Sequence, residues 1–192
     1  MRFSSLRTVA LAVAVGSVVL VGCTTTKETD TASAKSSSGS IDAQVDATLN
    51  RLYAAAPDAR ELVAKSAGVL VFPAVLGGSF VIGAEHGRGA LRTHGRTEDY
   101  YSLSAGSVGW QIGAQSKAVI YVFNTKDALD KFRNSKGWVA GVDATVAVAR
   151  IGVNGTIDSE TVKQPVVGFV MNNAGLEAGV SLQGSKITKI TP

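Results

Sequence analysis

The sequence is poor in the residues that most often carry chemistry. Its 192 residues include one cysteine and two histidines. A lone cysteine excludes a disulfide within the chain. His86 and His94 are eight residues apart and have no cysteine partner. A metal site there would need carboxylates to converge from Glu85, Glu98 or Asp99. Exposed hairpin histidines are the favoured interpretation, and we expect no metal site.

Sequence motifs of enzyme active sites are also missing. Ala105 stands where a GxSxG nucleophile elbow needs its first glycine. A dinucleotide-binding loop starting at Gly87 would need a third glycine where Arg92 stands, and no Gly-Lys-Ser/Thr phosphate loop occurs. Asp143 and Glu177 could be paired catalytic carboxylates, but structural hydrogen bonding is the favoured role. We therefore predict that the protein is not an enzyme and holds no cofactor.

Long hydrophobic runs occur twice, and the first lies at the N-terminus. Arg2 and Arg7 precede an uncharged segment from Thr8 to Gly22. A basic start, a short apolar core and small residues before a cleavage point are typical of a secretory signal peptide. Fifteen residues is short for a transmembrane helix, which needs ~20. Residues 1–22 are therefore predicted to be a signal peptide.

Leu20-Val21-Gly22-Cys23 resembles the lipobox of bacterial lipoproteins. The resemblance implies cleavage before Cys23, a diacylglyceryl group on its sulfur, and further acylation, such as palmitate, at the new N-terminus. Two or more acyl chains anchor a protein stably in a membrane. By analogy with lipoprotein sorting, Thr24 after the cysteine implies the outer membrane, with the domain in the periplasm or at the cell surface. The alternative is a signal anchor with an inert cysteine.

Residues 23–40 are predicted to be the lipidated cysteine and a flexible tether. Thr24–Ser40 has no aliphatic residue larger than alanine, so it cannot bury enough apolar surface to fold. Without Arg2 and Arg7 the chain keeps 17 basic and 15 acidic residues, a net charge of +2. This charge is too small to indicate nucleic-acid binding. Residues 41–192 have the length of one domain.

Two helices are predicted in that domain. Apolar residues from Ile41 to Ala56 recur with a 3.6-residue period, with Ser40 as a plausible N-cap. A shorter helix is predicted over Thr125–Lys136, with Asn124 as its N-cap. Asp58–Ser66 could add a further helical turn or two.

The second long hydrophobic run, Ala67–Ala84, contains eighteen residues and no charge. Its length is about that of a transmembrane candidate. Pro73 and the glycines at 77 and 78 would break a single helix near its middle. We therefore predict two buried strands, Val69–Phe72 and Ser79–Ile82, joined by a Pro/Gly turn.

Most of the remaining domain has the character of short strands. Asn154-Gly155 predicts a two-residue hairpin turn, and Leu176–Gln183 alternates apolar and polar residues. The fold class predicted is α+β, mostly antiparallel β in a barrel-like or sandwich sheet, with an N-terminal amphipathic helix and one further short helix. The other predicted strands are Gly89–Thr93, Tyr100–Leu103, Ser107–Ala114, Ala118–Phe123, Thr145–Val153 and Val166–Met171.

Two basic clusters are candidates for binding anionic lipid headgroups. Arg88, Arg92 and Arg96 are spaced by four, which places them on one face of an extended segment. A basic amphipathic helix that ends near a tryptophan can lie at a bilayer interface. Its candidate residues are Lys126, Lys131, Arg133, Lys136 and Trp138. Solvated hairpin and helix faces are the favoured alternative in both cases.

The ordered motifs of the domain resemble the SYLF family of actin-regulator-like lipid-binding domains. The matching segments are 67–73, 78–83 with Gly87 and Gly89, 106–113, 141–146 and 178–184. The resemblance implies lipid binding, of phosphoinositides in eukaryotic members, and in some members actin-associated roles. Bacterial members are commonly lipoproteins.

The sequence thus predicts a non-enzymatic outer-membrane lipoprotein whose domain contacts lipid at the cell envelope. Its expected partners are membrane lipid through acylated Cys23 and an anionic phospholipid, but not nucleic acid. The alternative is a structural or protein-interaction module with an unidentified envelope partner and no ligand beyond its own anchor.

Overall fold

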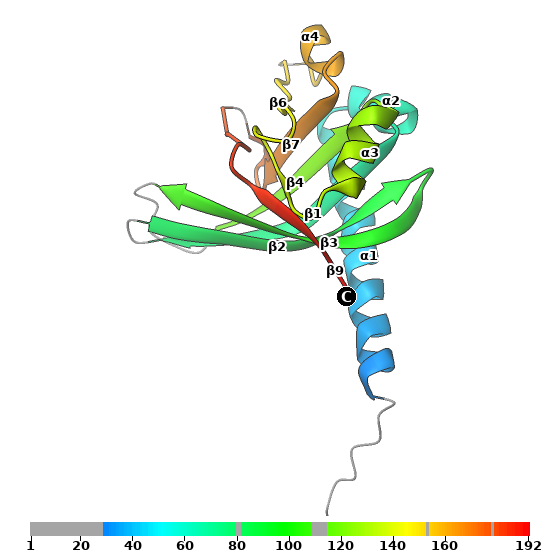
Figure 1. The fold of residues 1–192 in the computed structure, drawn as a ribbon. Helices are drawn as coiled ribbons and strands as arrows, with labels where there is room; N and C mark the ends of the chain where they lie inside the picture. The colour runs from blue at the N-terminus through cyan, green and yellow to red at the C-terminus, as the bar shows by residue number, and fades with distance from the viewer. Residues whose placement is uncertain (1–28, 80–81, 109–114, 153, 178) are drawn as a thin grey trace, which may run out of the picture.

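The structure is a computed structural model that describes residues 29–79, 82–108, 115–152, 154–177 and 179–192. The predicted signal peptide and Cys23 lie outside these residues. The fold is α+β, as predicted, and is built on one curled, mostly antiparallel sheet (Figure 1). The strand order is β5-β9-β3-β2-β1-β4-β7-β6, and β8 pairs with β7.

The sheet is formed by strands from every part of the domain, and the described residues contain four helices. The helices are α1 (Thr29–Ala55), α2 (Asp58–Lys65), α3 (Lys126–Asn134) and α4 (Ser159–Val162). The strands are β1 (Gly68–Ser79), β2 (Ile82–Thr93), β3 (Arg96–Val108), β4 (Gln115–Phe123), β5 (Trp138–Val139), β6 (Ala147–Val148), β7 (Val166–Asn172), β8 (Gly175–Leu176) and β9 (Lys186–Ile190). No described helix is both long enough and apolar enough to span a bilayer.

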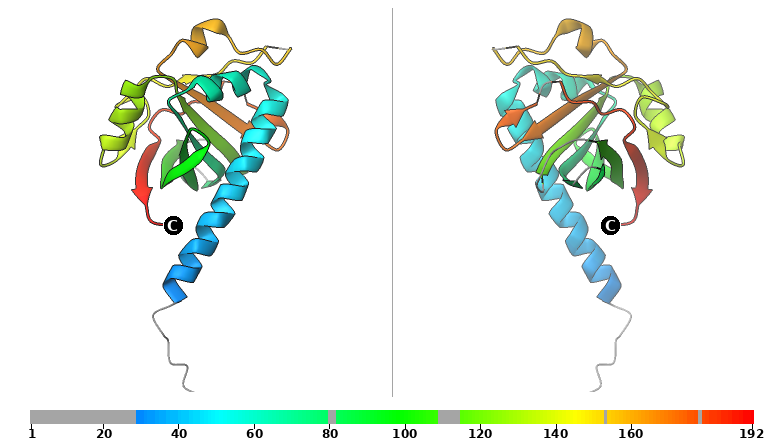
Figure 2. Two further views of the ribbon diagram at one scale, coloured as in Figure 1. Left: turned by 90° about the vertical axis from the view of Figure 1, so that its right-hand side faces the viewer. Right: turned by 90° about the vertical axis from the view of Figure 1, so that its left-hand side faces the viewer.

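Helices cover the sheet on both faces. Figure 2 shows α1 running diagonally across one side and α3 standing on the other. In β4, Ile120 and Val122 belong to the core beneath α1, whereas Tyr121 and Phe123 belong to the core beneath α3. Strands buried on both faces need apolar residues at successive positions. This explains the continuous apolar run of Ala118–Phe123.

The apolar stripe of α1 is confirmed, but the helix begins earlier than predicted. Val45 and Leu52 are fully buried against the sheet. Helix α1 starts at Thr29, so Ser40 lies inside it, and its hydroxyl donates to the Ser37 carbonyl. The described part of the predicted tether, 29–40, is therefore helical. Extending a helix from a packed segment avoids the cost of nucleation, which composition alone does not reveal.

Helix α3 is confirmed with a different N-cap. The Thr125 hydroxyl, not the Asn124 amide, accepts from the Ala128 N–H. The Asn124 amide instead donates to the carbonyls of Val162 and Gln164. The helix also stops at Asn134, two residues before the predicted end. Both residue types are good N-caps, so the choice between them depends on a tertiary contact.

The run Ala67–Ala84 is confirmed as β structure, but its predicted Pro/Gly turn is wrong. Strand β1 continues through Pro73 to Ser79, and the chain reverses between Ser79 and Ile82. A β-bulge interrupts the pairing of β1 with both neighbours, leaving Pro73 without a ladder partner. Proline lacks an N–H, so a bulge is where a central strand tolerates it.

The C-terminal strands differ most from the sequence prediction. Among the described residues of the predicted strand Leu176–Gln183, which leave out 178, only Leu176 is in a strand, whereas β9, which was not predicted, pairs with β3. The described part of the predicted strand Thr145–Val153, which ends at 152, contains only the two-residue β6, and an isolated bridge joins Ile151 to Ile157 around the predicted turn. Ser107–Ala114 is described only to Val108, inside β3.

Candidate functional site

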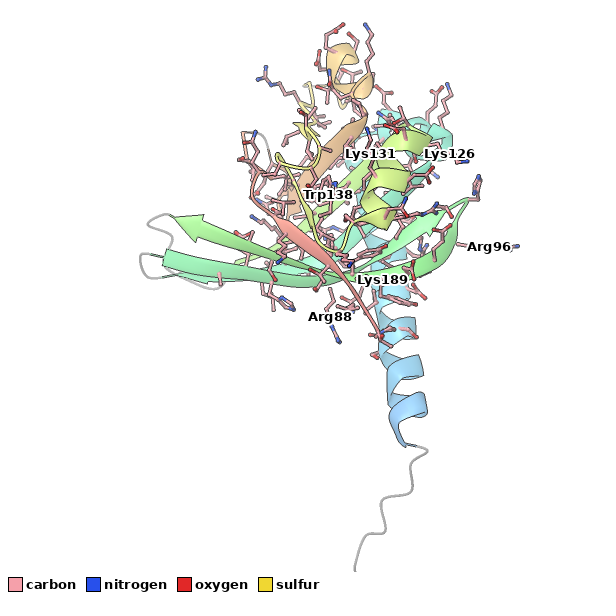
Figure 3. All side chains as sticks on the ribbon, viewed as in Figure 1. Arg88, Arg96, Lys126, Lys131, Trp138 and Lys189 are labelled. Atoms are coloured by element: carbon pink, nitrogen blue, oxygen red, sulfur yellow. The ribbon has the colours of Figure 1, made fainter. Side chains whose placement is uncertain are left out.

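The fold separates one of the three arginines of the predicted basic strip from the other two. Arg88 is exposed on β2, and Arg92 lies further along the same strand. Arg96 begins β3, across the turn formed by His94 and Gly95, where both residues have positive φ. Figure 3 shows Arg96 at the end of this hairpin and Arg88 below the sheet, on the side toward which α1 extends. Arg88 and Arg92 share the face of β2 that α1 covers, as predicted, whereas Arg96 lies beyond the turn and does not continue the strip.

Arg92 has a structural role. Its side chain is 11% exposed and pairs with Asp46 of α1. It also donates to the Asp42 carbonyl at 3.1 Å. The Asp42 carboxylate accepts from the Tyr100 hydroxyl at 2.9 Å, and burial together with this carboxylate raises the pKa of Tyr100. These bonds hold α1 against the β2–β3 hairpin.

Arg92→Ala is expected to lower the free energy of unfolding by about 1–3 kcal/mol, because it leaves the partly buried Asp42 carbonyl on α1 without this donor. Asp46 is 60% exposed, so water compensates part of this loss. The matched control is Arg96→Ala, at an exposed position with an expected change within about 0.5 kcal/mol. Urea unfolding followed by circular dichroism measures both. Equal effects of the two substitutions would contradict the structural role.

The predicted membrane-binding helix has no apolar face left for a bilayer. Leu129 and Phe132 of α3 are 2% exposed, and Trp138 is 1% exposed. Lys131 pairs with Asp127 at 2.9 Å, and Arg133 pairs with Glu98. The hypothesis of an interfacial helix anchored by Trp138 is therefore wrong, because the sheet has already buried the residues that would enter the lipid.

The cations of α3 differ in their surroundings. Burial opposes the ionisation of Glu98, but hydrogen bonds from Thr93 and Arg133 outweigh it and hold the pKa of this carboxyl below its usual value. Arg133 is thereby held to the β2–β3 hairpin. Lys126 and Lys136 are exposed, and no carboxylate of the described residues pairs with either. Figure 3 shows Lys126 and Lys131 on the outer side of α3.

A groove lies beside Arg88. It has a volume of about 330 Å³, and its walls come from α1, β1 and β2. Leu76 stands opposite His86 in the β1–β2 ladder, and Ala74 stands opposite Arg88. Residues two apart on a strand share a face, so these four side chains lie together on the face covered by α1. We call this group the Arg88 groove.

The Arg88 groove combines apolar surface with positive charge. Ile41, Pro73 and Leu76 contribute apolar lining, and Leu76 is 60% exposed. Arg88 is exposed, and no carboxylate of the described residues pairs with it. The His86 ring nitrogen Nδ1 lies 3.4 Å from the Ser104 hydroxyl. Such a site can bind an anionic group through the guanidinium while an apolar chain contacts leucine.

The remaining candidate polar residues do not converge. Asp143 is exposed in a tight loop and accepts from the Val139 N–H at 2.6 Å. Glu177 accepts from the Asn172 amide at 2.7 Å. Of the carboxylates considered with the histidines, Glu85 pairs with Lys117, and Asp99 pairs with Lys189. Within the described ranges, no group of three or more His, Cys, Asp or Glu residues is placed to hold a metal ion.

The sequence prediction missed the apolar part of the Arg88 groove. Pro73 and Leu76 belong to the uncharged run and lie in the segment that was predicted to be a Pro/Gly turn between two buried strands. The available signal was weak, because only the bulge at Pro73 and the register of β1 with β2 place Leu76 beside His86 at the surface. Register depends on both strands and cannot be read from one.

Comparison with known proteins supports the resemblance in the C-terminal half. Residues 104–191 match a family model described as "Ysc84: Las17-binding protein actin regulator". The matched region runs from β3 to β9. No curated protein matches the chain. The predicted resemblance to the SYLF family is therefore confirmed over residues 104–191, where the chain is similar to the Ysc84 family model.

Proposed function

We propose that the protein is a non-enzymatic outer-membrane lipoprotein, anchored through Cys23, whose SYLF domain binds anionic phospholipid through the Arg88 groove. The observation that carries the proposal is the position of an exposed leucine next to an arginine that no described carboxylate pairs. An arginine can donate two parallel hydrogen bonds to one phosphate. Full burial of a leucine side chain contributes about 1.5–3 kcal/mol.

The short distance along the chain from the predicted anchor at Cys23 also favours the Arg88 groove as the lipid-binding site. Six residues from Cys23 to Thr29 span at most ~21 Å. Eight further residues of α1, up to Ser37 beside the groove, add ~12 Å. An acylated Cys23 would therefore confine the groove to within about 33 Å of the bilayer. Such confinement raises the effective concentration of lipid at a weak site.

A site-specific fluorescent label tests the proposal. Because Cys23 is the only cysteine, Leu76→Cys in a Cys23→Ser chain gives a single labelling position. With an environment-sensitive dye at this position, vesicles containing anionic phospholipid are expected to shift the emission to the blue, and zwitterionic vesicles are not. Adding Arg88→Glu is expected to abolish at least 80% of the shift, since like charges repel.

Val142 offers the matched control, because it is the other exposed large apolar residue of the described chain, 79% exposed in the loop after β5. A label at Val142→Cys is expected to stay in water. A shift at Leu76 that is independent of lipid charge, or one that Arg88→Glu leaves unchanged, would overturn the assignment of this groove.

A second candidate function is the binding of a protein partner at the envelope. It is favoured by the description of the matched family model, which names a Las17-binding protein, and by the exposure of Val142 in a tight loop. Two results together would favour this function over lipid binding. The vesicle test would give no response, and the chain would capture one partner protein that the Val142→Asp variant does not capture.

A further inference from the structure

A second cavity lies away from the Arg88 groove, between α1, α2 and the turn that joins β2 to β3. Its volume is about 300 Å³. Leu49, Val63 and Val69 contribute apolar lining. Tyr53, Arg60 and His94 add polar groups. A mostly apolar cavity with a few polar groups is typical of a binding site for a small organic molecule, and this volume is at the small end of that range.

The charge in the cavity centres on Arg60. Its guanidinium lies 4.6 Å from the centre of the Tyr53 ring. A cation–π contact with the ring does not use the N–H groups that point away from it, so these stay available as donors. No carboxylate of the described residues pairs with Arg60, whereas Glu61 beside it pairs with Lys65.

Two neighbouring groups reinforce the preference for an anion. Arg92 also lines the cavity, although its terminal nitrogens are engaged by Asp46 and Asp42. Its Nε atom is buried, and no described atom accepts from it. Burial raises the pKa of the Tyr53 hydroxyl, while the two arginines act in the opposite direction. The hydroxyl therefore stays protonated near neutral pH and can donate a hydrogen bond.

We propose that this cavity binds a small amphipathic carboxylate, such as a medium-chain fatty acid, with its carboxylate on Arg60 and Tyr53 and its chain against Leu49, Val63 and Val69. The guanidinium and the carboxylate match in charge and in planar geometry. The apolar walls favour a hydrocarbon chain over a simple inorganic anion. This site shares no residue with the Arg88 groove.

Calorimetric titration of the purified full chain tests the proposal, with octanoate as the probe. Octanoate is expected to bind at one site per chain, and 1-octanol, which has the same chain without charge, at least tenfold more weakly. Arg60→Gln is expected to weaken octanoate binding at least tenfold. Lys126→Gln removes an exposed cation on the other side of the sheet and serves as the control with unchanged affinity.

A cavity-filling variant separates binding from folding. Ala64 lies on the exposed side of α2 and lines the cavity, so Ala64→Trp should occupy it without disturbing the core. Loss of octanoate binding in this variant, with the helical circular dichroism signal intact, supports the site. Equal binding of octanol and octanoate, or no effect of Arg60→Gln and Ala64→Trp, would overturn it. Arg60→Gln leaves the Leu76 label test unaffected, so the two proposals fail separately.

Discussion

Gly89→Ala is expected to destabilise the domain by more than about 4 kcal/mol, a loss outside the usual range for one methyl group. A Cβ atom at Gly89 would lie 2.1 Å from the Val71 carbonyl oxygen and 2.7 Å from Cδ1 of Phe72. The nearest atom belongs to the backbone of a central strand, so it cannot move aside as the end of a flexible side chain could. Urea or thermal unfolding of the purified chain measures the loss.

Gly106→Ala is the matched control. Gly106 lies in β3, and a Cβ atom there would meet nothing within 4 Å. Its φ is not among the positive values. The change in unfolding free energy is expected to stay within about 0.5 kcal/mol, because alanine there restricts the unfolded chain without straining the folded one. Similar stabilities of the Gly89 and Gly106 variants would contradict the close approach of β1 to β2.

The bulge of β1 explains why β2 needs its glycines. The β1–β2 register shifts between Val71 and Ala74, and the backbone of β1 there lies over Gly87 and Gly89. A Cβ atom at Gly87 would lie 2.8 Å from the Ala74 carbonyl oxygen. The same bulge accommodates Pro73 and carries the chain onward to exposed Leu76. One irregularity therefore accounts for both the glycines of β2 and the apolar wall of the Arg88 groove.

Trp138→Ala is expected to cost about 3–5 kcal/mol of unfolding free energy, because it empties a large volume from the core. The indole is 1% exposed and contacts the rings of Tyr121, Phe123 and Phe132 at centroid distances of 5.7, 6.3 and 5.6 Å. All three ring contacts would be lost at once. Chemical unfolding in urea, with near-ultraviolet circular dichroism to follow the aromatic packing, measures the effect.

Lys136→Ala provides the control for Trp138, since Lys136 is exposed two residues away. Its expected effect on stability is within about 0.5 kcal/mol. The vesicle response of a label at Leu76 should survive a conservative Trp138→Phe substitution, since the indole lies in the core. Loss of that response in a folded Trp138→Phe variant would indicate that Trp138 contacts the membrane interface after all.

The candidate site was only partly predictable from the sequence. Arg88 was identified as a lipid-contact candidate, and it is the only member of its predicted strip that is exposed on β2. Arg92 was grouped with it because the spacing of the arginines does not show which residues each side chain contacts. The acceptors of Arg92, Asp42 and Asp46, lie on α1, about 50 residues away in the sequence. Trp138 was misassigned for the same reason. A buried aromatic and an interfacial one are alike in sequence until the packing is known.

Local patterns in the sequence determined which segments become helices and strands. The period of α1 and the apolar run of β4 depend on residues a few positions apart, so the chain reveals them directly. The tertiary structure alone decided the register of β1 with β2, the bulge at Pro73, the addition of β9 beside β3 and the pairing of Arg92 with α1. Each of these depends on free-energy differences between segments that meet only after folding, and no single stretch of sequence contains both partners.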